Sequence, residues 1–274
     1  MLFPQVALSL AQVALLFYQR VNAGHSAFCL DFPLSCTNKT AVPNTCCFNY
    51  PGGELLQTQF WDTDPATGPA NHWTVHGLWP DHCDGTYDQY CDENRQYKNI
   101  TSILQSYGRT SLLSYMSTYW KDQGGNDESF WEHEWGKHGT CVSTFDPSCY
   151  TNYTPQEEIV DYFQKTVDLF KTLDSYKFLA IAGIVPSTTK TYTSQQVEKA
   201  LGIFRGGVNA SIQCGGKGEN ELQQIYYHFH VAGSAQDGIY VPTQPDGTSN
   251  CPQEGILYLP KNLTTAPKPV SSPS

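Results

Sequence analysis

Alternating apolar and polar residues predict five strands along the chain. The segments begin at Leu55 (LLQTQFW), His72 (HWTVHGLW), Phe178 (FLAIAGIV), Ile225 (IYYHFHVAG) and Gly255 (GILYLP). Each is short and rich in β-branched or aromatic residues, as strands are. In the second segment we place His72, Thr74 and His76 on one face, with Gly77 next and a turn at Pro80.

Helical signals lie mainly between these strands. Residues Thr154 to Glu157 have the form of a capping box with Pro155 at the first helical position, and a helix through Leu173 is expected to follow. A second box, Thr193-x-x-Gln196, predicts a short helix, and TSILQSYGRTSLLSYMSTYW predicts one or two more. Because helices cluster in the middle and do not alternate regularly with strands, we expect an α+β fold with a mainly antiparallel central sheet.

The first residues predict export. VALSLAQVALLF is an uncharged apolar run, too short to cross a bilayer, that ends near Val21-Asn22-Ala23. We assign residues 1–23 to a signal peptide, 24–263 to one disulfide-stapled catalytic domain, and 264–274 to a disordered tail rich in Pro, Ser and Thr. The expected product is secreted, or delivered to a vacuolar or lysosome-like compartment, and carries no membrane anchor.

The cysteine count agrees with export. Ten cysteines predict five disulfide bonds, and their spacings contain no C-x-x-C pair of the kind that zinc modules use. The sequence alone leaves the pairing open. Glycosylation is predicted at the Asn-x-Ser/Thr sequons of Asn38, Asn99, Asn152, Asn209 and Asn262.

The segment FWEHEWGKHGTC, from Phe130 to Cys141, concentrates ionisable groups. On a helix, His133, Glu134, Lys137 and His138 share one arc with Phe130, and the two tryptophans point elsewhere. The plain alternative is a solvated helix face with pairs four residues apart. The bulky aromatics around the charges favour a rigid site instead.

A metal site does not fit this spacing. Zinc proteases place two histidines four residues apart with a glutamate after the first, whereas here Lys137 stands four residues after His133 and His138 stands five after it. The ammonium group would also repel a cation. We therefore expect no metal and no other cofactor.

Together, HWTVHGLWP and FWEHEWGKHGTC resemble the two active-site segments of the ribonuclease T2 family of secreted acid endoribonucleases, and the chain is similar to fungal members. The resemblance implies that RNA is cleaved by metal-independent transesterification, through a 2′,3′-cyclic phosphate to 3′-phosphate ends, with low base specificity. It also implies the disulfide pairs Cys29–Cys47, Cys36–Cys83, Cys46–Cys149, Cys91–Cys141 and Cys214–Cys251.

The resemblance assigns a role to each matching residue. His138 is expected to be the general base, His76 the general acid and His133 a phosphate-binding group, with Lys137 and Glu134 stabilising the pentacovalent phosphorus. These roles suit imidazole, because its pKa lies near 6.5 and both protonation states are accessible in mildly acidic fluid. Base binding is expected at one site from Trp79, Asp81 and Tyr87, and at a second site from Gln59 and Phe130.

Net charge limits the partners. The chain carries a formal charge of −10 with neutral histidines, which argues against broad capture of nucleic acid at neutral pH. Its eight histidines reduce that charge in acid. We expect a monomer that acts on single-stranded RNA and does not cleave DNA.

Two other function classes compete with this one. A non-catalytic secreted binding or toxic module is disfavoured by the complete set of catalytic residues. A metallohydrolase would be inhibited by a chelator.

Overall fold

The computed structural model describes residues 44–247 and 249–261 and, before them, 25–26, 29, 33–38, 40 and 42. The expected signal peptide, the expected tail and the sequon at Asn262 lie outside the described residues. Among the residues that are described, no helix has both the length and the apolar character needed to cross a membrane. The domain limits given above remain predictions.

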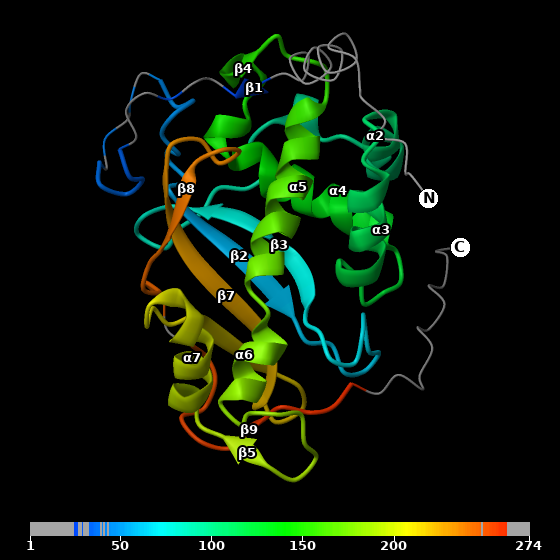
Figure 1. Ribbon diagram of the computed structural model, residues 1–274, viewed down its shortest axis with the longest axis vertical. Coiled ribbons are helices and arrows are strands. Elements are labelled where there is room, and N and C mark those ends of the chain that lie inside the picture. The colour runs from blue at the N-terminus through cyan, green and yellow to red at the C-terminus, as the bar shows by residue number, and fades with distance from the viewer. Residues whose placement is uncertain are drawn as a thin grey trace, which may run out of the picture.

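A seven-stranded sheet forms the centre of the fold (Figure 1). Its main path runs β3-β2-β7-β9-β5, and β6 and β8 each pair with β7; all pairs are antiparallel except β7–β9. The strands are β2 Glu54–Phe60, β3 Thr74–Asp81, β5 Thr191–Tyr192, β6 Ser211–Gly215, β7 Glu221–Ala232, β8 Ile239–Pro242 and β9 Ile256–Leu257. A separate two-residue pair joins β1 His25–Ser26 to β4 Tyr150–Thr151. The predicted α+β class with a mainly antiparallel sheet is confirmed.

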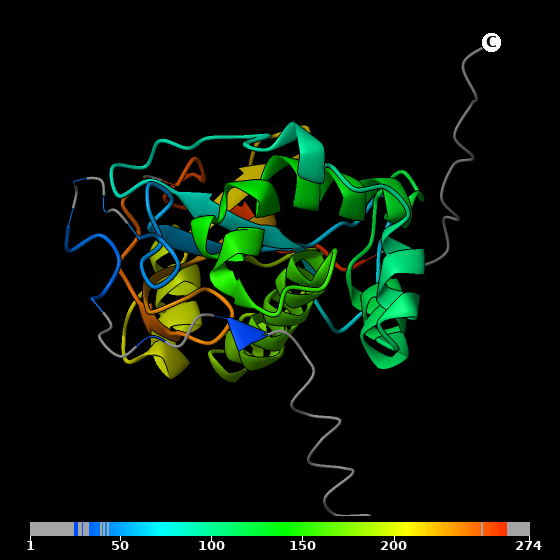
Figure 2. The same cartoon turned by 90° about the horizontal axis from the view of Figure 1, so that it is seen from above.

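Helices α5, α6 and α7 group on one side of this sheet (Figure 2), and α2, α3 and α4 lie together beside β3 (Figure 1). Their bounds are α2 Ile100–Ser106, α3 Thr110–Tyr119, α4 Asp127–Lys137, α5 Glu157–Thr172, α6 Ser175–Ile181 and α7 Ser194–Gly202. Short 3-10 turns follow the same order: η1 Glu93–Arg95, η2 Gly139–Cys141, η3 Ser143–Phe145, η4 Pro147–Cys149 and η5 Ile203–Arg205.

Two apolar cores hold these elements together. One lies under α2 to α5 and includes Trp120, Trp131, Trp135 and Tyr162. The other lies under α6 and α7 and is formed by residues such as Trp61, Trp73, Tyr227 and Tyr258. Burying a large aromatic side chain stabilises a fold by roughly 2–3 kcal/mol, so this concentration of buried rings fixes the sheet and α4 relative to each other.

Two of the element predictions need correction. Phe178 was expected to begin a strand, but it lies in α6, which is capped where the Asp174 side chain accepts a hydrogen bond from the Lys177 amide at 3.1 Å. A short buried apolar run has the same pattern in a helix as in a strand, which explains the error. The helix expected from Pro155 begins only at Glu157, because Gln156 has a left-handed backbone with φ 74°.

The other capping and helix predictions are confirmed. Thr193 and Gln196 form both hydrogen bonds of a capping box at the start of α7. The segment around Gly108 contains two helices, α2 and α3, and Gly108 lies between them with φ 66°. Strands β6 and β8 were not predicted.

Five disulfides link the described chain, with the pairing that the resemblance implies. They join Cys29–Cys47, Cys36–Cys83, Cys46–Cys149, Cys91–Cys141 and Cys214–Cys251. No cysteine among the described residues is free. Of the sequons, Asn38, Asn99 and Asn152 are exposed and Asn209 is half-buried.

Candidate active site

A β-bulge in β3 turns His76 toward the face of the sheet that α5 does not cover. Thr58 pairs with Gly77 and Gln59 pairs with Val75, so His76 is the extra residue between them. A bulge shifts the alternation of side chains by one position. Val75 and Leu78 both enter the core as a result, and His76 is left half-buried on the opposite face, called the cleft face below.

The bulge also corrects the expected strand geometry. Thr74 is fully buried, and β3 does not end before Pro80 but continues through it to Asp81. His72 lies before the strand, where its ring packs edge-on against Tyr119. His72 lies outside β3, so its predicted place on one strand face with Thr74 and His76 is wrong. Thr74 and His76 do share a face, because Thr74 pairs with Phe60, whose ring stacks on His76.

Helix α4 supplies the other ionisable groups. It begins where the Asn126 side chain accepts a hydrogen bond from the Ser129 amide. The acidic residues in its first turn are stabilised by the positive end of the helix dipole. Trp131 and Trp135 on its inner side are buried in the core. Because they anchor the helix, the arc that carries His133 and Glu134 is held beside β3.

Glu134 and His76 meet at the centre of the site. Glu134 is fully buried, and its Oε1 lies 3.6 Å from His76 Nε2. Its other oxygen, Oε2, accepts a hydrogen bond of 2.9 Å from the Trp79 indole. The second ring nitrogen of His76, Nδ1, lies 3.3 Å from Gln224 Oε1 on β7. Both functional groups are thus held from two sides.

His138, the C-cap residue of α4, lies next to this pair. Its ring stacks on Trp79 with centroids 4.6 Å apart and an interplanar angle of 14°. Its ring centroid is 6.4 Å from that of His133. His133 is exposed, and its Nδ1 lies 3.4 Å from the Tyr90 hydroxyl. Three imidazoles from two distant segments therefore surround Glu134.

Burial controls the protonation of these groups. Burial, opposed by the hydrogen bond that His76 Nδ1 donates to Gln224 Oε1 and aided by the charges of His133 and Lys137, lowers the pKa of His76 to about 3. Burial, followed by the charges of Lys137, His76 and His133, lowers the pKa of His138 to about 2. Burial raises the pKa of Glu134 to about 8, although Trp79 and Lys137 oppose this.

These opposite directions decide the state of the His76–Glu134 contact. In mildly acidic solution Glu134 holds a proton and His76 is neutral, so the contact is a neutral pair and not an ion pair. Glu134 Oε1 makes no hydrogen bond within the described residues and lies 3.6 Å from His76 Nε2. The pKa of His133 is also lowered, by burial and by Lys137. Mutual repulsion among these cationic groups would be relieved by an anion.

The first predicted base site lies farther along the cleft face. Asp81 is two residues after Trp79 and forms an isolated bridge with Tyr87, whose side chain is 58% exposed. Trp79 itself has a second role, because it hydrogen-bonds Glu134 and stacks on His138. The structure thus brings Trp79, Asp81 and Tyr87 together.

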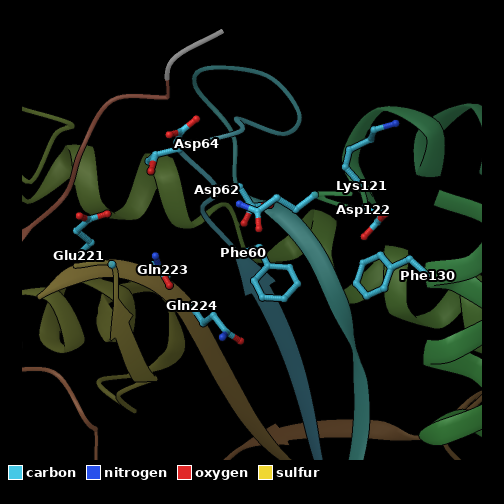
Figure 3. A pocket seen from close by; sticks show the side chains of 12 residues that line it. Phe60, Asp62, Asp64, Lys121, Asp122, Phe130, Glu221, Gln223 and Gln224 are labelled. Atoms are coloured by element: carbon cyan, nitrogen blue, oxygen red, sulfur yellow. The ribbon is translucent and has the colours of Figure 1, made fainter. Parts of the chain in front are cut away.

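The second predicted base site is brought together only in part. Phe130 lies 5.8 Å from His76 between ring centroids and lines a pocket of about 400 Å³ with Phe60 and Gln224 (Figure 3). Gln59 is elsewhere: its side chain is fully buried on the opposite side of β2, and its amide donates to Gln57 and to the Leu173 carbonyl. Gln59 cannot contact a base in this position.

Two residues at the site were missed from the sequence. Phe60 stacks on His76 with centroids 3.8 Å apart, and Gln224 bonds the same ring. A signal for Gln224 existed, because polar side chains recur every second residue in β7 at Gln224, Tyr226 and His228. His228, the last of these, is buried and bonded to Glu54.

Two groups among the described residues bring potential metal ligands within 4.8 Å of one another: His133, Glu134 and His138, and Glu54, His228 and Asp246. In the first group, the ammonium of Lys137 would repel a cation. In the second, the Glu54 and His228 side chains already bond each other at 2.7 Å.

Comparison with known proteins places this arrangement in a family. Residues 41–238 match the Ribonuclease T2 family. Ribonuclease T2 of Aspergillus oryzae is 56% identical over 231 residues, which cover 84% of this chain and 83% of that protein. Ribonuclease Trv of Hypocrea rufa is 56% identical over 230 residues, covering 84% and 96%. A ribonuclease T2-like protein of Emericella nidulans is 53% identical over 93% of this chain, which spans 61% of that longer relative.

Solved structures agree with these matches. The crystal structure of Actibind, a T2 ribonuclease, superposes with a TM-score of 0.82 at 55% identity, covering 86% of this chain and 99% of Actibind. Human RNase T2 superposes with a TM-score of 0.54 at 27% identity, covering 76% and 98%. From its sequence match, its relatives and its fold, the chain belongs to the ribonuclease T2 family.

Proposed function

We propose that this protein is an endoribonuclease that cleaves single-stranded RNA by transesterification in mildly acidic surroundings. The observation that carries the proposal is the gathering of His76, His133 and His138 around one buried carboxyl group, Glu134. A phosphodiester bound there would relieve the repulsion that lowers the pKa of the imidazoles. Family membership supports the same chemistry.

In the first step, His138 takes the proton of the ribose 2′-hydroxyl, and the 2′-oxygen attacks phosphorus. The bond between phosphorus and the 5′-oxygen breaks, His76 delivers a proton to that oxygen, and a 2′,3′-cyclic phosphate remains. Each proton transfer of this kind typically contributes about 10²- to 10⁴-fold to the rate. In the second step, water adds to the cyclic phosphate and leaves a 3′-phosphate end.

The charges of the site suit this sequence of events. His138 is neutral above about pH 2, as a base must be. A phosphodiester bound beside His76 would raise the pKa of that imidazole, so that His76 takes up the proton that it delivers to the leaving group. A protonated Glu134 also adds no negative charge beside the phosphorane, and with Lys137 it would stabilise the developing charge. His133, exposed beside them, is the proposed phosphate-binding group.

Base contacts are proposed at both ends of the phosphate site. Trp79, Asp81 and Tyr87 would hold one base, and Phe130 the other, by stacking and a few hydrogen bonds, as single-stranded RNA recognition usually requires. Such contacts give low base specificity. We further propose a secreted, glycosylated monomer without a membrane anchor, which is supported by the export-like first residues and the five disulfides.

The experiment is incubation of the purified protein with RNA and with DNA at about pH 5, below the ordinary histidine pKa, each with excess chelator. We expect cleavage of RNA alone, because DNA lacks the 2′-hydroxyl nucleophile. Loss of RNA cleavage in chelator would support a metallohydrolase instead. An intact RNA substrate without chelator would support a non-catalytic binding module.

A further inference from the structure

A buried hydrogen-bonded chain crosses three strands at the Asp81 end of the cleft face. The Ser211 hydroxyl on β6 lies 2.8 Å from His228 Nε2, and His228 Nδ1 lies 2.7 Å from Glu54 Oε1 on β2. The side chains of His228 and Glu54 are each only 4% exposed. We call these three residues the relay.

The proposed cleavage chemistry does not use the relay. His76 and His138 contact Trp79, whereas Asp81, which pairs with Glu54 of the relay, lies two residues farther along β3. A buried ion pair also adds little net stability compared with apolar side chains of similar size. The position of the relay therefore suggests a role at the base site.

Glu54 connects the relay to Asp81. The two residues are direct partners across the antiparallel strands β2 and β3, so their side chains leave the sheet on the same face. Two acidic groups directly opposite each other disfavour double ionisation. Burial, followed by the charge of Glu54, raises the pKa of Asp81 to about 7.

Other titratable groups face Asp81 from the neighbouring elements. Asp246, in the segment between β8 and β9, also raises its pKa, while His228 on β7 and the adjacent His82 lower it. Burial, followed by the charge of Asp81, raises the pKa of the Tyr226 phenol on β7 to about 12. Of the acidic groups, Glu54 has the larger effect and is the buried one.

We propose that Ser211, His228 and Glu54 are positioning residues that set whether Asp81 meets a base as a carboxylic acid or as a carboxylate, and so make the base preference of the cleft depend on pH. The inference rests on the proposed function. A carboxylate only accepts hydrogen bonds and favours the exocyclic amine of adenine or cytosine. A carboxylic acid also donates one and tolerates the carbonyl oxygen that uracil has in place of the cytosine amine.

The test compares dinucleoside monophosphates that differ in one base: CpA with UpA, and ApC with ApU, so that the base varies on either side of the phosphate. The ratio of kcat/KM within each pair cancels the titration of the catalytic histidines. For the wild type, we expect the cytosine-to-uracil ratio of one pair to rise about three- to tenfold between about pH 5 and pH 7.5, which is the range for one neutral hydrogen bond. A ratio equal at both pH values would overturn the proposal.

Two variants assign that change to the relay. Glu54→Gln removes the charge opposite Asp81 but keeps an oxygen for His228, so the pKa of Asp81 should fall and the ratio at about pH 5 should rise toward the high-pH value of the wild type. Asp81→Asn should give a ratio independent of pH, and it serves if Glu54→Gln does not fold. His72→Gln, the control, should follow the wild type. A Glu54→Gln enzyme that keeps the wild-type ratio at both pH values would contradict the relay.

Binding measurements separate this inference from the proposed function. Calorimetric affinities for cytidine and uridine 5′-monophosphate, at the same pH values, should show the same change in ratio without any cleavage. A wild type that cleaves none of the dinucleotides would reject the proposed function alone. A ratio of nucleotide affinities that does not change with pH would reject the relay alone.

Discussion

The carboxyl group of Glu134 fills the space that a Cβ atom on Gly77 would need: such an atom would overlap Glu134 Oε2. Gly77 is the residue after the bulged His76, so the bulge directs His76 and the bare backbone of Gly77 toward the same carboxyl group. The position of Glu134 therefore depends on the absence of a side chain at residue 77.

This contact predicts the effect of Gly77→Ala. Glu134 must move away from His76 and Trp79, and a displacement of about 1 Å at a catalytic group typically costs about 10²-fold in rate. We expect overpacking to cost about 1–3 kcal/mol of stability without preventing folding. Initial rates on RNA and a denaturant titration measure the two effects. Gly136→Ala is the control, because its Cβ atom would meet nothing closer than Gln96 at 3.7 Å; equal rates for the two variants would contradict the argument.

Substitution of Glu134 itself tests whether its protonated form is the active one. Glu134→Gln keeps a hydrogen-bond donor without a negative charge, so it should retain activity within about tenfold at acid pH, whereas Glu134→Ala removes the donor and should lose about 10²-fold or more. Steady-state kinetics on a dinucleotide distinguish the two. A Gln variant as inactive as the Ala variant would show that the carboxylate is required.

The same residue should make stability depend on pH. The pKa of Glu134 rises from its ordinary 4.5 to about 8 on folding, so between these values the folded protein keeps a proton that the unfolded chain has released. Stability due to Glu134 is therefore full below about pH 4.5 and is lost as pH rises toward 8. His76 acts in the opposite direction, but only between about pH 3 and its ordinary pKa of 6.5.

Above about pH 6.5 the free energy of unfolding should thus decrease with pH, with Glu134 contributing at most about 1.4 kcal/mol per pH unit. Asp81, whose pKa is raised to about 7, contributes to the lower part of this window. Urea unfolding at a series of pH values should give a smaller slope for Glu134→Gln. Glu132→Gln, on the same helix but paired with Lys98 at the surface, should keep the wild-type slope. No difference between the two variants would contradict the raised pKa.

Phosphate binding should be accompanied by proton uptake. Burial and mutual repulsion lower the pKa of His76 and His138, and an anion between the imidazoles would raise it again. We expect the protein to take up protons when it binds inorganic phosphate at about pH 5. Calorimetry would show this as a binding heat that changes with the ionisation enthalpy of the buffer. Identical heats in two such buffers would mean that the imidazoles do not change protonation.

The sequence predicted the helix that carries the site and the identity of its main groups. The arc of His133, Glu134, Lys137 and His138 followed from helical geometry, and the tryptophans behind it are buried as expected. The pairing of this helix with β3 could not be derived from periodicity, because it depends on contacts between residues far apart in the chain. The resemblance to a known family supplied it.

What could not be predicted follows from tertiary packing. The bulge at His76 is a mismatch between two strands, and neither strand shows it alone. The register of the sheet places the Gln59 side chain on the buried face of β2, opposite the cleft face, so it cannot make its expected contact with a base. The run after Phe178 forms a helix because Asp174 caps it, a local signal that the apolar pattern concealed.

The central claim is that His138 removes the 2′-hydroxyl proton of RNA while the phosphate lies between His138 and His76. It is tested most directly by following a dinucleoside monophosphate by phosphorus NMR at about pH 5, with the wild type and with His138→Phe. The account predicts a 2′,3′-cyclic phosphate that accumulates before the 3′-phosphate with the wild type, and no conversion with a folded His138→Phe protein. A wild type that forms the 3′-phosphate without the cyclic species, or a His138→Phe protein with wild-type turnover, would contradict it.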